Sequence, residues 1–471
     1  MKVLFINPPA DRGVRMQREG RCMQHAGTWS SVWSPLSLAC CAAVLREAGH
    51  EVGITDCIAE NISFRGLEGV VGNFAPELAV INTATPSIVS DLYAADTARK
   101  VNSRIRTAVI GVHVTALPEE VLRAGRSVDF AVRGEPEMTV MKLCGALAGG
   151  GDAWDVDGIS YMKDGSVVHN GPAPFITDLD ALPYPAYDLI KTEKYTLPFS
   201  GDKFLLVSAG RGCPHRCGFC TEHVYYGSRL RLRTPAGPAD EVLHWRDALG
   251  VRSFFFWSPG FTLDRANCAG LAEELLRRNA GVEWMCNSRV DDVDGELLAL
   301  FRRAGCRTIG FGIESGDDEV LRGMRKGIDT AESAAAVRAA KEAGLEVVAN
   351  VVVGHPGDSE ASIRRTIHFV KRLGVDYAQF YCAVPFPGTQ LYSDAKKNGR
   401  LASEDWRRYE QSYSVLNLEG LTPKRIMKLR KRAFREFYLR PGTVLRILGK
   451  FRKSGTFADL PAALRFLRKW F

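Results

Sequence analysis

Short apolar runs alternate with helical stretches along the first 147 residues, and this alternation constrains the fold more than any other feature of the sequence. The runs typical of strands are Lys2–Ile6, Glu51–Asp56, Glu77–Thr83, Thr107–Ile110 and Asp129–Val132. Helical stretches lie between or after them, at Leu36–Ala48, Leu67–Asn73, Val89–Asn102 and Met138–Leu147. Strands that alternate with helices in this way form a parallel sheet covered on both faces. We therefore predict a doubly wound, Rossmann-like α/β domain over residues 1–150.

A segment rich in Gly, Pro and Asp follows, and it predicts a linker over residues 151–200 with a small hairpin at Gly158–His169. The alternation then resumes, with strand-like runs at Phe204–Ser208, Ser253–Trp257, Glu283–Asn287, Thr308–Ile313, Val347–Val353 and Tyr377–Ala383. Six such units predict a (β/α)6-type partial TIM barrel over residues 201–400, whose chemistry lies on the loops after the strands. Residues 401–471 are predicted to form a basic helical C-terminal region.

Small, hydroxyl and glycine residues gather where the predicted strands of the first domain end. Ligands of open parallel sheets bind beyond the carboxyl ends of the strands. Residues of these types let a large ligand approach the backbone and form hydrogen bonds with it. The candidate contacts are Thr83, Thr85, Ser87, Gly111, His113, Thr115, Gly134 and Glu135.

Three cysteines, Cys213, Cys217 and Cys220, crowd onto one loop after the first predicted barrel strand. Their thiolates can hold three irons of a [4Fe–4S] cluster, and no nearby fourth cysteine is present to bind the last iron. One iron is then open to a substrate or cofactor. The alternative is a zinc site, which normally takes four ligands and would need His215 or His223. The position of the loop after a barrel strand favours the cluster.

Composition indicates an ordinary globular protein of two or three domains. The 471 residues exceed what one hydrophobic core usually organises, and 46% hydrophobic with 25% charged residues is typical of folded proteins. We find no run of 18 apolar residues, and the N-terminus turns polar too early for a secretory signal. The twelve cysteines lack the spacing of a disulfide scaffold. We expect a cytoplasmic location.

The cysteine motif, with Phe219 before its last cysteine, resembles the signature of the radical S-adenosylmethionine (SAM) superfamily. The resemblance implies that the open iron binds SAM, which is cleaved to a 5′-deoxyadenosyl radical. It also implies an external electron donor of the flavodoxin or ferredoxin type. The segment 310–316 (GFGIESG) is similar to the GxESG element of the family. When the SAM contacts of the family are transferred to the matching positions of this chain, the resemblance implies contacts at Phe219, Arg289, Glu314, Ser315 and Asn350. The chain departs from the family at 257–262, where relatives often carry an acidic pair.

An α/β domain ahead of such a barrel resembles the cobalamin (B12)-binding subgroup of the superfamily, which includes class B methyltransferases and anaerobic Mg-protoporphyrin monomethyl ester cyclases. Two prolines follow the first strand, and residues 111–120 carry GxHxTxxPEE. The resemblance implies cobalamin as a further cofactor. Many cobalamin enzymes carry DxHxxG, whose histidine ligates cobalt. His113 lacks the preceding Asp and the following Gly, so we expect it to contact the nucleotide tail or phosphate and not the cobalt.

Two functions of different reaction type follow from this resemblance. The leading hypothesis is a cobalamin-dependent methyltransferase acting on an unactivated carbon of an apolar, lipid-, tetrapyrrole- or natural-product-like small molecule. The alternative is a radical SAM cyclase or oxidoreductase without methyl transfer. A non-catalytic cobalamin sensor is disfavoured, because it has no need for three thiolates on one loop.

The positive charge of the chain resides in its C-terminal tail. Residues 423–471 hold fifteen Lys and Arg against two acidic residues, whereas the whole chain has a net charge of +8. Aromatic and aliphatic residues alternate with these cations. Two interpretations stay open: a helix that packs its apolar face on the barrel, or an amphipathic helix in peripheral contact with the inner membrane surface. We do not expect nucleic-acid binding, because no recognised reading module is present.

Overall fold

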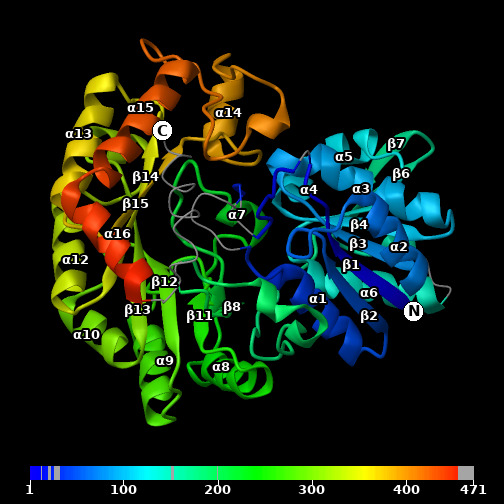
Figure 1. Ribbon diagram of the computed structural model, residues 1–471. Helices are drawn as coiled ribbons and strands as arrows, with labels where there is room; N and C mark the ends of the chain where they lie inside the picture. The colour runs from blue at the N-terminus through cyan, green and yellow to red at the C-terminus, as the bar shows by residue number, and fades with distance from the viewer. Residues whose placement is uncertain (12, 20–22, 26–31, 150–152, 199, 454–471) are drawn as a thin grey trace.

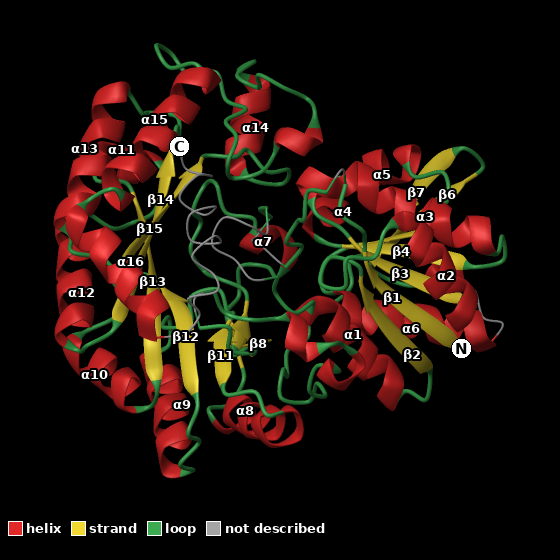
Figure 2. Ribbon diagram, viewed as in Figure 1, coloured by secondary structure: helices red, strands yellow, loops and turns green. Residues whose placement is uncertain are grey.

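The computed structural model describes residues 1–453 except 12, 20–22, 26–31, 150–152 and 199 (Figure 1). Two large sheets organise these residues, and a third sheet has only two strands. One large sheet has seven strands in the order β2-β1-β3-β4-β5-β6-β7, and the other has six in the order β15-β14-β13-β12-β11-β8. Figure 2 shows the two large sheets side by side, each with helices packed against it. The prediction of a doubly wound domain followed by a partial barrel is confirmed.

Five parallel strands form the centre of the first sheet. They are β1 (Lys2–Asn7), β2 (Glu51–Asp56), β3 (Leu78–Asn82), β4 (Arg106–Ile110) and β5 (Phe130–Val132). The helices between them are α1 (Leu36–Glu47), α2 (Phe64–Phe74), α3 (Ile88–Val101), α4 (Val112–Ala116), α5 (Pro118–Ala124) and α6 (Pro136–Gly149). The strand order reverses between β1 and β3, and ligands of such sheets bind at that switch point.

Alternation along the buried strands explains why helices cover both faces of this sheet. Successive side chains of a strand point to opposite faces. Val3 and Phe5 therefore pack in the same cluster as α1 and α6, whereas Leu4 and Ile6 pack with α2 and α3. All four of these β1 side chains are buried.

The predicted hairpin is present but belongs to the first sheet. It consists of β6 (Ile159–Lys163) and β7 (Ser166–His169), and β6 pairs antiparallel with β5. Part of the range predicted as a linker thus extends the sheet, although the domain boundaries themselves stay predictions.

The second sheet is parallel throughout and forms the partial barrel. Its strands are β8 (Phe204–Val207), β11 (Ser253–Phe256), β12 (Glu283–Ser288), β13 (Cys306–Glu314), β14 (Glu346–Val353) and β15 (Tyr377–Cys382). Helices α8 (Ala236–Leu249), α9 (Arg265–Arg277), α10 (Gly295–Arg303), α12 (Thr330–Glu342) and α13 (Glu360–Arg372) cover its outer face (Figure 1). Shorter helices, α11 (Asp318–Gly323) and α14 (Gln390–Lys397), follow the ends of β13 and β15.

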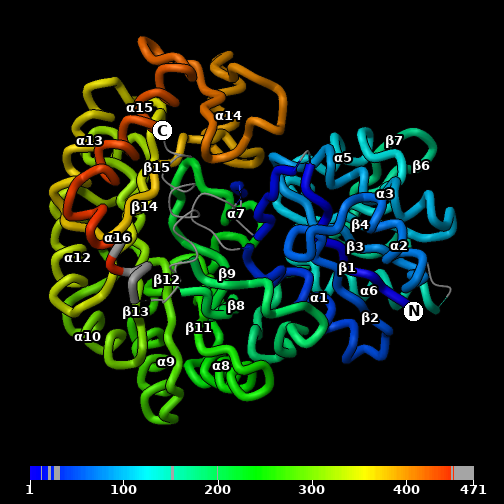
Figure 3. The backbone as a smooth tube through the Cα atoms, in the orientation of Figure 1, coloured from blue at the N-terminus to red at the C-terminus, as the bar shows by residue number. Residues whose placement is uncertain are grey.

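Buried ion pairs join the start of α6 in the first domain to a separate two-stranded sheet that follows β8. Arg211 belongs to β9 (Gly210–Arg211), which pairs with β10 (Arg231–Leu232). The guanidinium of Arg211 donates two hydrogen bonds, of 2.6 and 3.2 Å, to the Glu137 carboxylate at the start of α6. Arg231 lies 2.6 Å from Glu135. All four side chains are at most 6% exposed. The small helix α7 (Glu222–Tyr225) also lies between the two sheets (Figure 3).

The described part of the tail packs on the barrel. It forms α15 (Pro423–Tyr438) and α16 (Pro441–Lys453). The Tyr438 hydroxyl accepts a hydrogen bond from the Ala378 N–H (3.0 Å) and donates one to the Ala378 carbonyl (2.9 Å), so α15 covers the edge of β15. This geometry supports the packing interpretation for α15. Residues 454–471 lie outside the described residues. Within the described ones, no helix is long and apolar enough to cross a membrane.

Candidate cluster and cofactor site

The loop after β8 brings Cys213, Cys217 and Cys220 to one cavity. None of the three is in a disulfide, all are partly exposed, and all three line the cavity. The Gly218 N–H donates to the Met324 carbonyl, and the Gly218 carbonyl accepts from the Leu391 N–H. These bonds tie the middle of the loop to segments that follow β13 and β15.

A glycine at the start of the loop fixes its path. Gly212 has a φ of +78°, which glycine adopts without strain. A Cβ atom at this position would lie 2.1 Å from the carbonyl oxygen of Arg229. The backbone before Cys213 therefore passes too close to a neighbouring segment for any other residue.

The chemistry of these three thiols fits a cluster better than a zinc ion. Within the described ranges, no three or more His, Cys, Asp and Glu side chains are placed to hold a single metal ion. In a [4Fe–4S] cluster each thiolate binds a different iron, so the sulfurs need not converge on one point. The loop thus has the donor set of a cluster with one iron left without a protein thiolate.

Paired charges lie beside the cysteines at the carboxyl ends of β12 and β13. Lys326 Nζ donates to Glu314 Oε1 over 2.9 Å, and both side chains are about nine-tenths buried. Burial by itself lowers the pKa of Lys326, but Glu314 and Cys217 outweigh it and the pKa is raised. Arg289 donates two hydrogen bonds to Asp291. The cluster loop therefore faces two buried cations.

Glu314 has a backbone conformation that is rare for a residue other than glycine. Its φ is +58°, at a register shift between β13 and β14. Non-glycine residues held in this conformation cost about 1–3 kcal/mol and cluster at functional sites. Gly312 explains how the carboxylate fits, because a Cβ there would lie 2.6 Å from Glu314 Oε1 and 2.7 Å from Lys326 Nζ.

The other predicted SAM contacts divide into two groups. Phe219, Arg289 and Asn350 line the same cavity as the cysteines. The Phe219 ring also packs edge-on against His355, with centroids 6.4 Å apart. Ser315 does not line the cavity, because its buried hydroxyl lies 3.1 Å from that of Thr366 and accepts from the Asp317 N–H. A role of Ser315 in holding the turn explains these bonds.

The candidate cobalamin contacts lie at the carboxyl ends of β3, β4 and β5. Most of their hydroxyls bond within the protein: Thr83 donates to the Ile110 carbonyl, Ser87 to Asp91, and Thr115 to the Gly111 carbonyl. Gly111 and Gly134 both have positive φ values, of +130° and +74°. A ligand at these strand ends would therefore meet the backbone more than free hydroxyl groups.

His113 is held by protein contacts. Its Nδ1 lies 3.2 Å from Thr85 Oγ1, and its ring packs edge-on against Trp406 with centroids 5.0 Å apart. Burial lowers the pKa of His113 to about 4, so the ring is neutral at pH 7. These contacts support a packing and hydrogen-bonding role. That His113 does not ligate cobalt stays a prediction.

Glu135 was predicted to contact the ligand of the first domain, but its carboxylate points to the barrel. It pairs with Arg231 and accepts from the Ile176 N–H, because two buried guanidinium groups lie beside it. Sequence reasoning also missed Arg18, which lies over the switch point. The buried Arg18 donates to Asp91 on α3, to the side chain of Asn7 at the end of β1 and to the carbonyl of Pro8.

One cavity of about 1190 Å³ connects the cluster loop with the interior of the barrel. Gln24 and Trp33, which precede α1, also line it. It is larger than the roughly 300–1,000 Å³ of a site for one small ligand. Residues from both halves of the chain therefore border a chamber with room for more than one molecule. Sequence reasoning missed Gln24, Trp33 and Lys326, since nothing in the local pattern distinguishes them from surface residues.

Comparison with known protein families agrees with this division of the chain. Residues 207–370 match the family model described as the radical SAM superfamily, and residues 26–143 match the B12 binding domain. The radical SAM domain binds a [4Fe–4S] cluster and SAM, and the B12 binding domain binds cobalamin. These are the cofactors of this chain.

Relatives and solved structures match almost the whole chain. An uncharacterized methyltransferase of Pyrococcus horikoshii is 33% identical over 95% of this chain and 94% of its own length. An anaerobic magnesium-protoporphyrin IX monomethyl ester cyclase of Rubrivivax gelatinosus is 26% identical over 93% of this chain and 78% of that protein. The structure of the radical SAM methyltransferase TsrM from Kitasatospora setae, with cobalamin and the cluster bound, has a TM-score of 0.70 at 18% identity and covers 92% of this chain and 81% of that one. The chain therefore belongs to the radical SAM superfamily, in the branch that carries an N-terminal cobalamin-binding domain.

Proposed function

We propose that this protein is a cobalamin-dependent radical SAM methyltransferase that methylates an unactivated carbon of a small molecule. One observation carries the proposal: the three cluster thiols and two residues that precede α1, Gln24 and Trp33, line a single chamber. Methyl transfer needs the radical site and the methyl donor to reach the same substrate. A chamber bordered by both cofactor domains supplies that access. The match to an uncharacterized methyltransferase over nearly the full chain agrees with it.

The residues present fit the three cofactors. Cys213, Cys217 and Cys220 would hold three irons, and Lys326 with Glu314 would meet the polar groups of SAM at the open side. The glycines at the ends of β4 and β5 would let cobalamin approach the backbone. Bound together, these groups supply a radical that removes a hydrogen atom and a methyl group that replaces it.

The protein itself orients these groups and shields them. Phe219 and His355 pack against each other beside the cysteines and cover one side of the loop with apolar surface. Lys326 Nζ donates a hydrogen bond to the Glu314 carboxylate and holds it in place although both side chains are buried. Buried charges that are paired and hydrogen-bonded stay oriented without reorganisation when a ligand arrives.

Measurement of coproducts tests the proposal. The protein is reconstituted anaerobically with iron, sulfide and cobalamin, then given SAM with a deuterated methyl group, a flavodoxin-type reductant, and candidate lipids or tetrapyrroles. We expect deoxyadenosine, S-adenosylhomocysteine and a product that carries the deuterated methyl group. A Cys217→Ala variant should form none of the deoxyadenosine while it still binds cobalamin.

The alternative is a radical cyclase or oxidoreductase without methyl transfer, favoured by the match to the Rubrivivax gelatinosus cyclase. Such an enzyme would give deoxyadenosine without S-adenosylhomocysteine or a labelled product. The same experiment therefore separates the two reactions.

Membrane contact through the end of the chain is a second part of the proposal. Leu445 on α16 is 69% exposed. Arg440 and Arg446 of the same region instead contact the barrel at Lys371 and Asp376. Because α15 covers β15, the informative truncation removes residues 441–471 and keeps α15. We expect this variant to co-sediment less with anionic vesicles than the full chain, and equal partitioning would contradict membrane contact.

A further inference from the structure

The chamber beside the cluster loop has two unlike walls, and this difference indicates what it holds. The strands of the barrel send alternate residues inward. In most TIM barrels large aliphatic side chains fill this space. Here Gly310 and Gly312 of β13 stand at inward positions. The missing side chains leave the barrel interior open as part of the cavity of about 1190 Å³.

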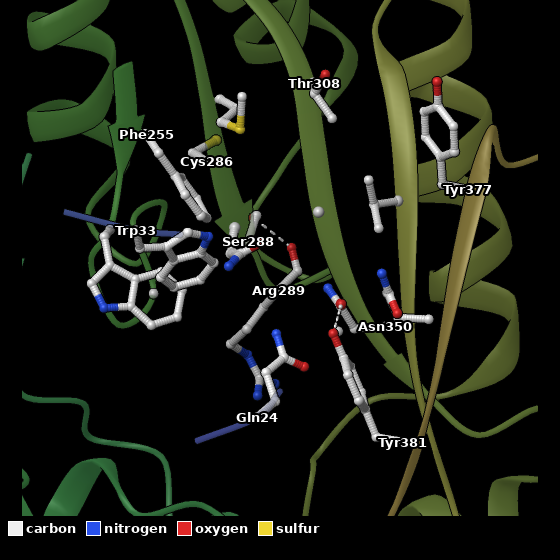
Figure 4. Close-up of a pocket in the computed structure, with 18 of the residues that line it drawn as sticks. Gln24, Trp33, Phe255, Cys286, Ser288, Arg289, Thr308, Asn350, Tyr377 and Tyr381 are labelled. Atoms are coloured by element: carbon white, nitrogen blue, oxygen red, sulfur yellow. Dashed lines mark hydrogen bonds between the residues drawn. The ribbon is translucent and has the colours of Figure 1, made fainter. Parts of the chain in front are cut away.

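The first wall is aromatic and is built by both domains. Trp33 precedes α1, Phe255 belongs to β11, and Trp257 follows β11. Their ring centroids lie 4.8 to 5.4 Å apart, in edge-to-face arrangements. All three side chains line the cavity, and Figure 4 shows Trp33 beside Phe255. Such rings bind flat apolar molecules by stacking and by burial of area.

The opposite wall carries side-chain amides. Asn350 of β14 is the register partner of Gln379 of β15, and Asn287 of β12 is the partner of Gly310. A Cβ on Gly310 would lie 2.3 Å from Asn287 Oδ1 and 3.4 Å from Asn350 Nδ2, so both amides extend over this glycine. In the described part of the chain, the amides of Asn287 and Gln379 have no hydrogen-bond partner. They offer donors and acceptors to a ligand in the cavity.

Charged residues line only the two ends of the chamber. Arg289, Glu314 and Lys326 lie at the carboxyl ends of the strands, beside the cluster loop. The amino ends carry the other charged side chains that line the chamber, Asp202, Glu283, Arg302, Arg307 and Glu346. Glu283 and Arg307 pair with each other over 2.7 Å. Among the described lining residues, the middle layer between them holds amide, hydroxyl, thiol and apolar side chains. A charged group placed there would lose its hydration without gaining an opposite charge, which is costly.

We infer that the substrate is an uncharged molecule with a flat, apolar ring system and neutral hydrogen-bonding groups, such as amides, carbonyls or hydroxyls, along one side. Its rings lie against Trp33, Phe255 and Trp257, and its polar groups face Asn287 and Gln379. The inference rests on the proposed function, because it takes the chamber beside the cluster as the substrate site. It narrows the substrate from any small molecule to one that is uncharged and flat.

A pair of probes of equal size tests the inference. Pyrenebutyramide and pyrenebutyrate share a flat ring system and differ in whether the end group is a neutral amide or an anion. Binding to the cluster-reconstituted protein is measured by anaerobic equilibrium dialysis with detection of pyrene fluorescence. We expect the amide to bind at least about tenfold tighter, because the middle of the chamber holds no cation for the carboxylate. Equal or tighter binding of pyrenebutyrate overturns the inference.

Three variants test the two walls separately. Trp33→Ala should weaken both probes by about fivefold or more, since one aromatic face is lost. Trp154→Ala, a matched control beside Tyr161 on the first sheet, should weaken neither. Gln379→Ala should weaken only the amide, by about fivefold, as expected for one neutral hydrogen bond. If Trp33→Ala binds both probes as tightly as the wild type does, the assignment of the aromatic wall is wrong. If Gln379→Ala loses the same affinity for both probes, the assignment of the amide wall is wrong.

The two proposals fail in different ways. Each preparation is also assayed for deoxyadenosine formed from SAM. Normal probe selectivity without deoxyadenosine or methyl transfer contradicts the proposed function and leaves the chamber assignment intact. Deoxyadenosine formation with no preference for the neutral probe contradicts the present inference alone. Circular dichroism of each variant shows that it is folded, and the wild-type comparison of the two probes needs no variant at all.

Discussion

Replacing Glu137 by glutamine tests whether a buried ion pair holds α6 of the first domain to β9. Glu137 accepts two hydrogen bonds from Arg211, and the two side chains are 2% and 6% exposed. Glutamine keeps the size of the side chain but removes its charge. Among the described residues, the one remaining carboxylate within 4 Å of the buried Arg211 guanidinium is then that of Glu135, 3.7 Å away. Breaking a buried pair in this way costs about 3–5 kcal/mol, because one charge is left uncompensated.

Urea denaturation followed by tryptophan fluorescence measures this cost. We expect the free energy of unfolding of Glu137→Gln to fall by about 3–5 kcal/mol. The double variant Glu137→Leu with Arg211→Met should recover most of that loss, since hydrophobic replacements of a buried pair are often neutral or stabilising. Glu119→Gln is the matched control, because Glu119 forms a solvent-exposed pair with Arg123. If Glu137→Gln and Glu119→Gln unfold at the same urea concentration, the buried pair does not stabilise the contact between α6 and β9.

Three further perturbations test other parts of the molecule. After reconstitution, Gly212→Ala should bind less than roughly half the iron that the wild type binds, because its Cβ would lie 2.1 Å from the Arg229 carbonyl oxygen. Gly399→Ala is the control and should bind iron normally, because Gly399 also has a positive φ but has open space around it. Burial raises the pKa of Glu19 to about 8 from 4.5, so the folded protein holds a proton that the unfolded chain releases in this range. Stability should therefore fall as the pH rises from about 5 to 8, and Glu19→Gln should flatten that slope in denaturation measured at several pH values. Lys326→Met should weaken SAM binding about tenfold or more, since the buried carboxylate beside it loses its cation. Lys326→Arg should restore part of it, as read from the SAM-induced change in the cluster EPR spectrum at unchanged iron content.

The strands and the cluster loop could be predicted because their signals are local. Buried parallel strands are mostly apolar runs, so Phe204–Ser208 and Val347–Val353 could be predicted, and they match β8 and β14 to within one residue. The spacing of Cys213, Cys217 and Cys220 is likewise a property of eight consecutive residues. The prediction that this loop follows the first barrel strand is confirmed by β8.

Features that depend on tertiary contacts were not predictable from the sequence. The hairpin at 159–169 was expected in a linker, but its pairing partner, Phe130–Val132, lies about thirty residues earlier, and register between distant strands leaves no local pattern. Lys326 is one of 62 Lys and Arg residues, and only the fold brings it to Glu314. Trp33 contributes to the chamber only because the first domain packs beside β11. The assignment of individual SAM and cobalamin contacts stays a prediction.

The hydroxyl of Tyr438 prevents copies of this protein from pairing through Ala378 at the edge of β15. A barrel that stops at six strands has edge strands, such as β15, whose unpaired N–H and carbonyl groups can form hydrogen bonds with a strand of a second chain. At Ala378 both groups are occupied by one phenol, and the Arg430 guanidinium occupies the carbonyl of Phe380. Removal of that phenol oxygen would uncover a template for edge-to-edge association, so the chief symptom of Tyr438→Phe should be aggregation during concentration and not a loss of fold.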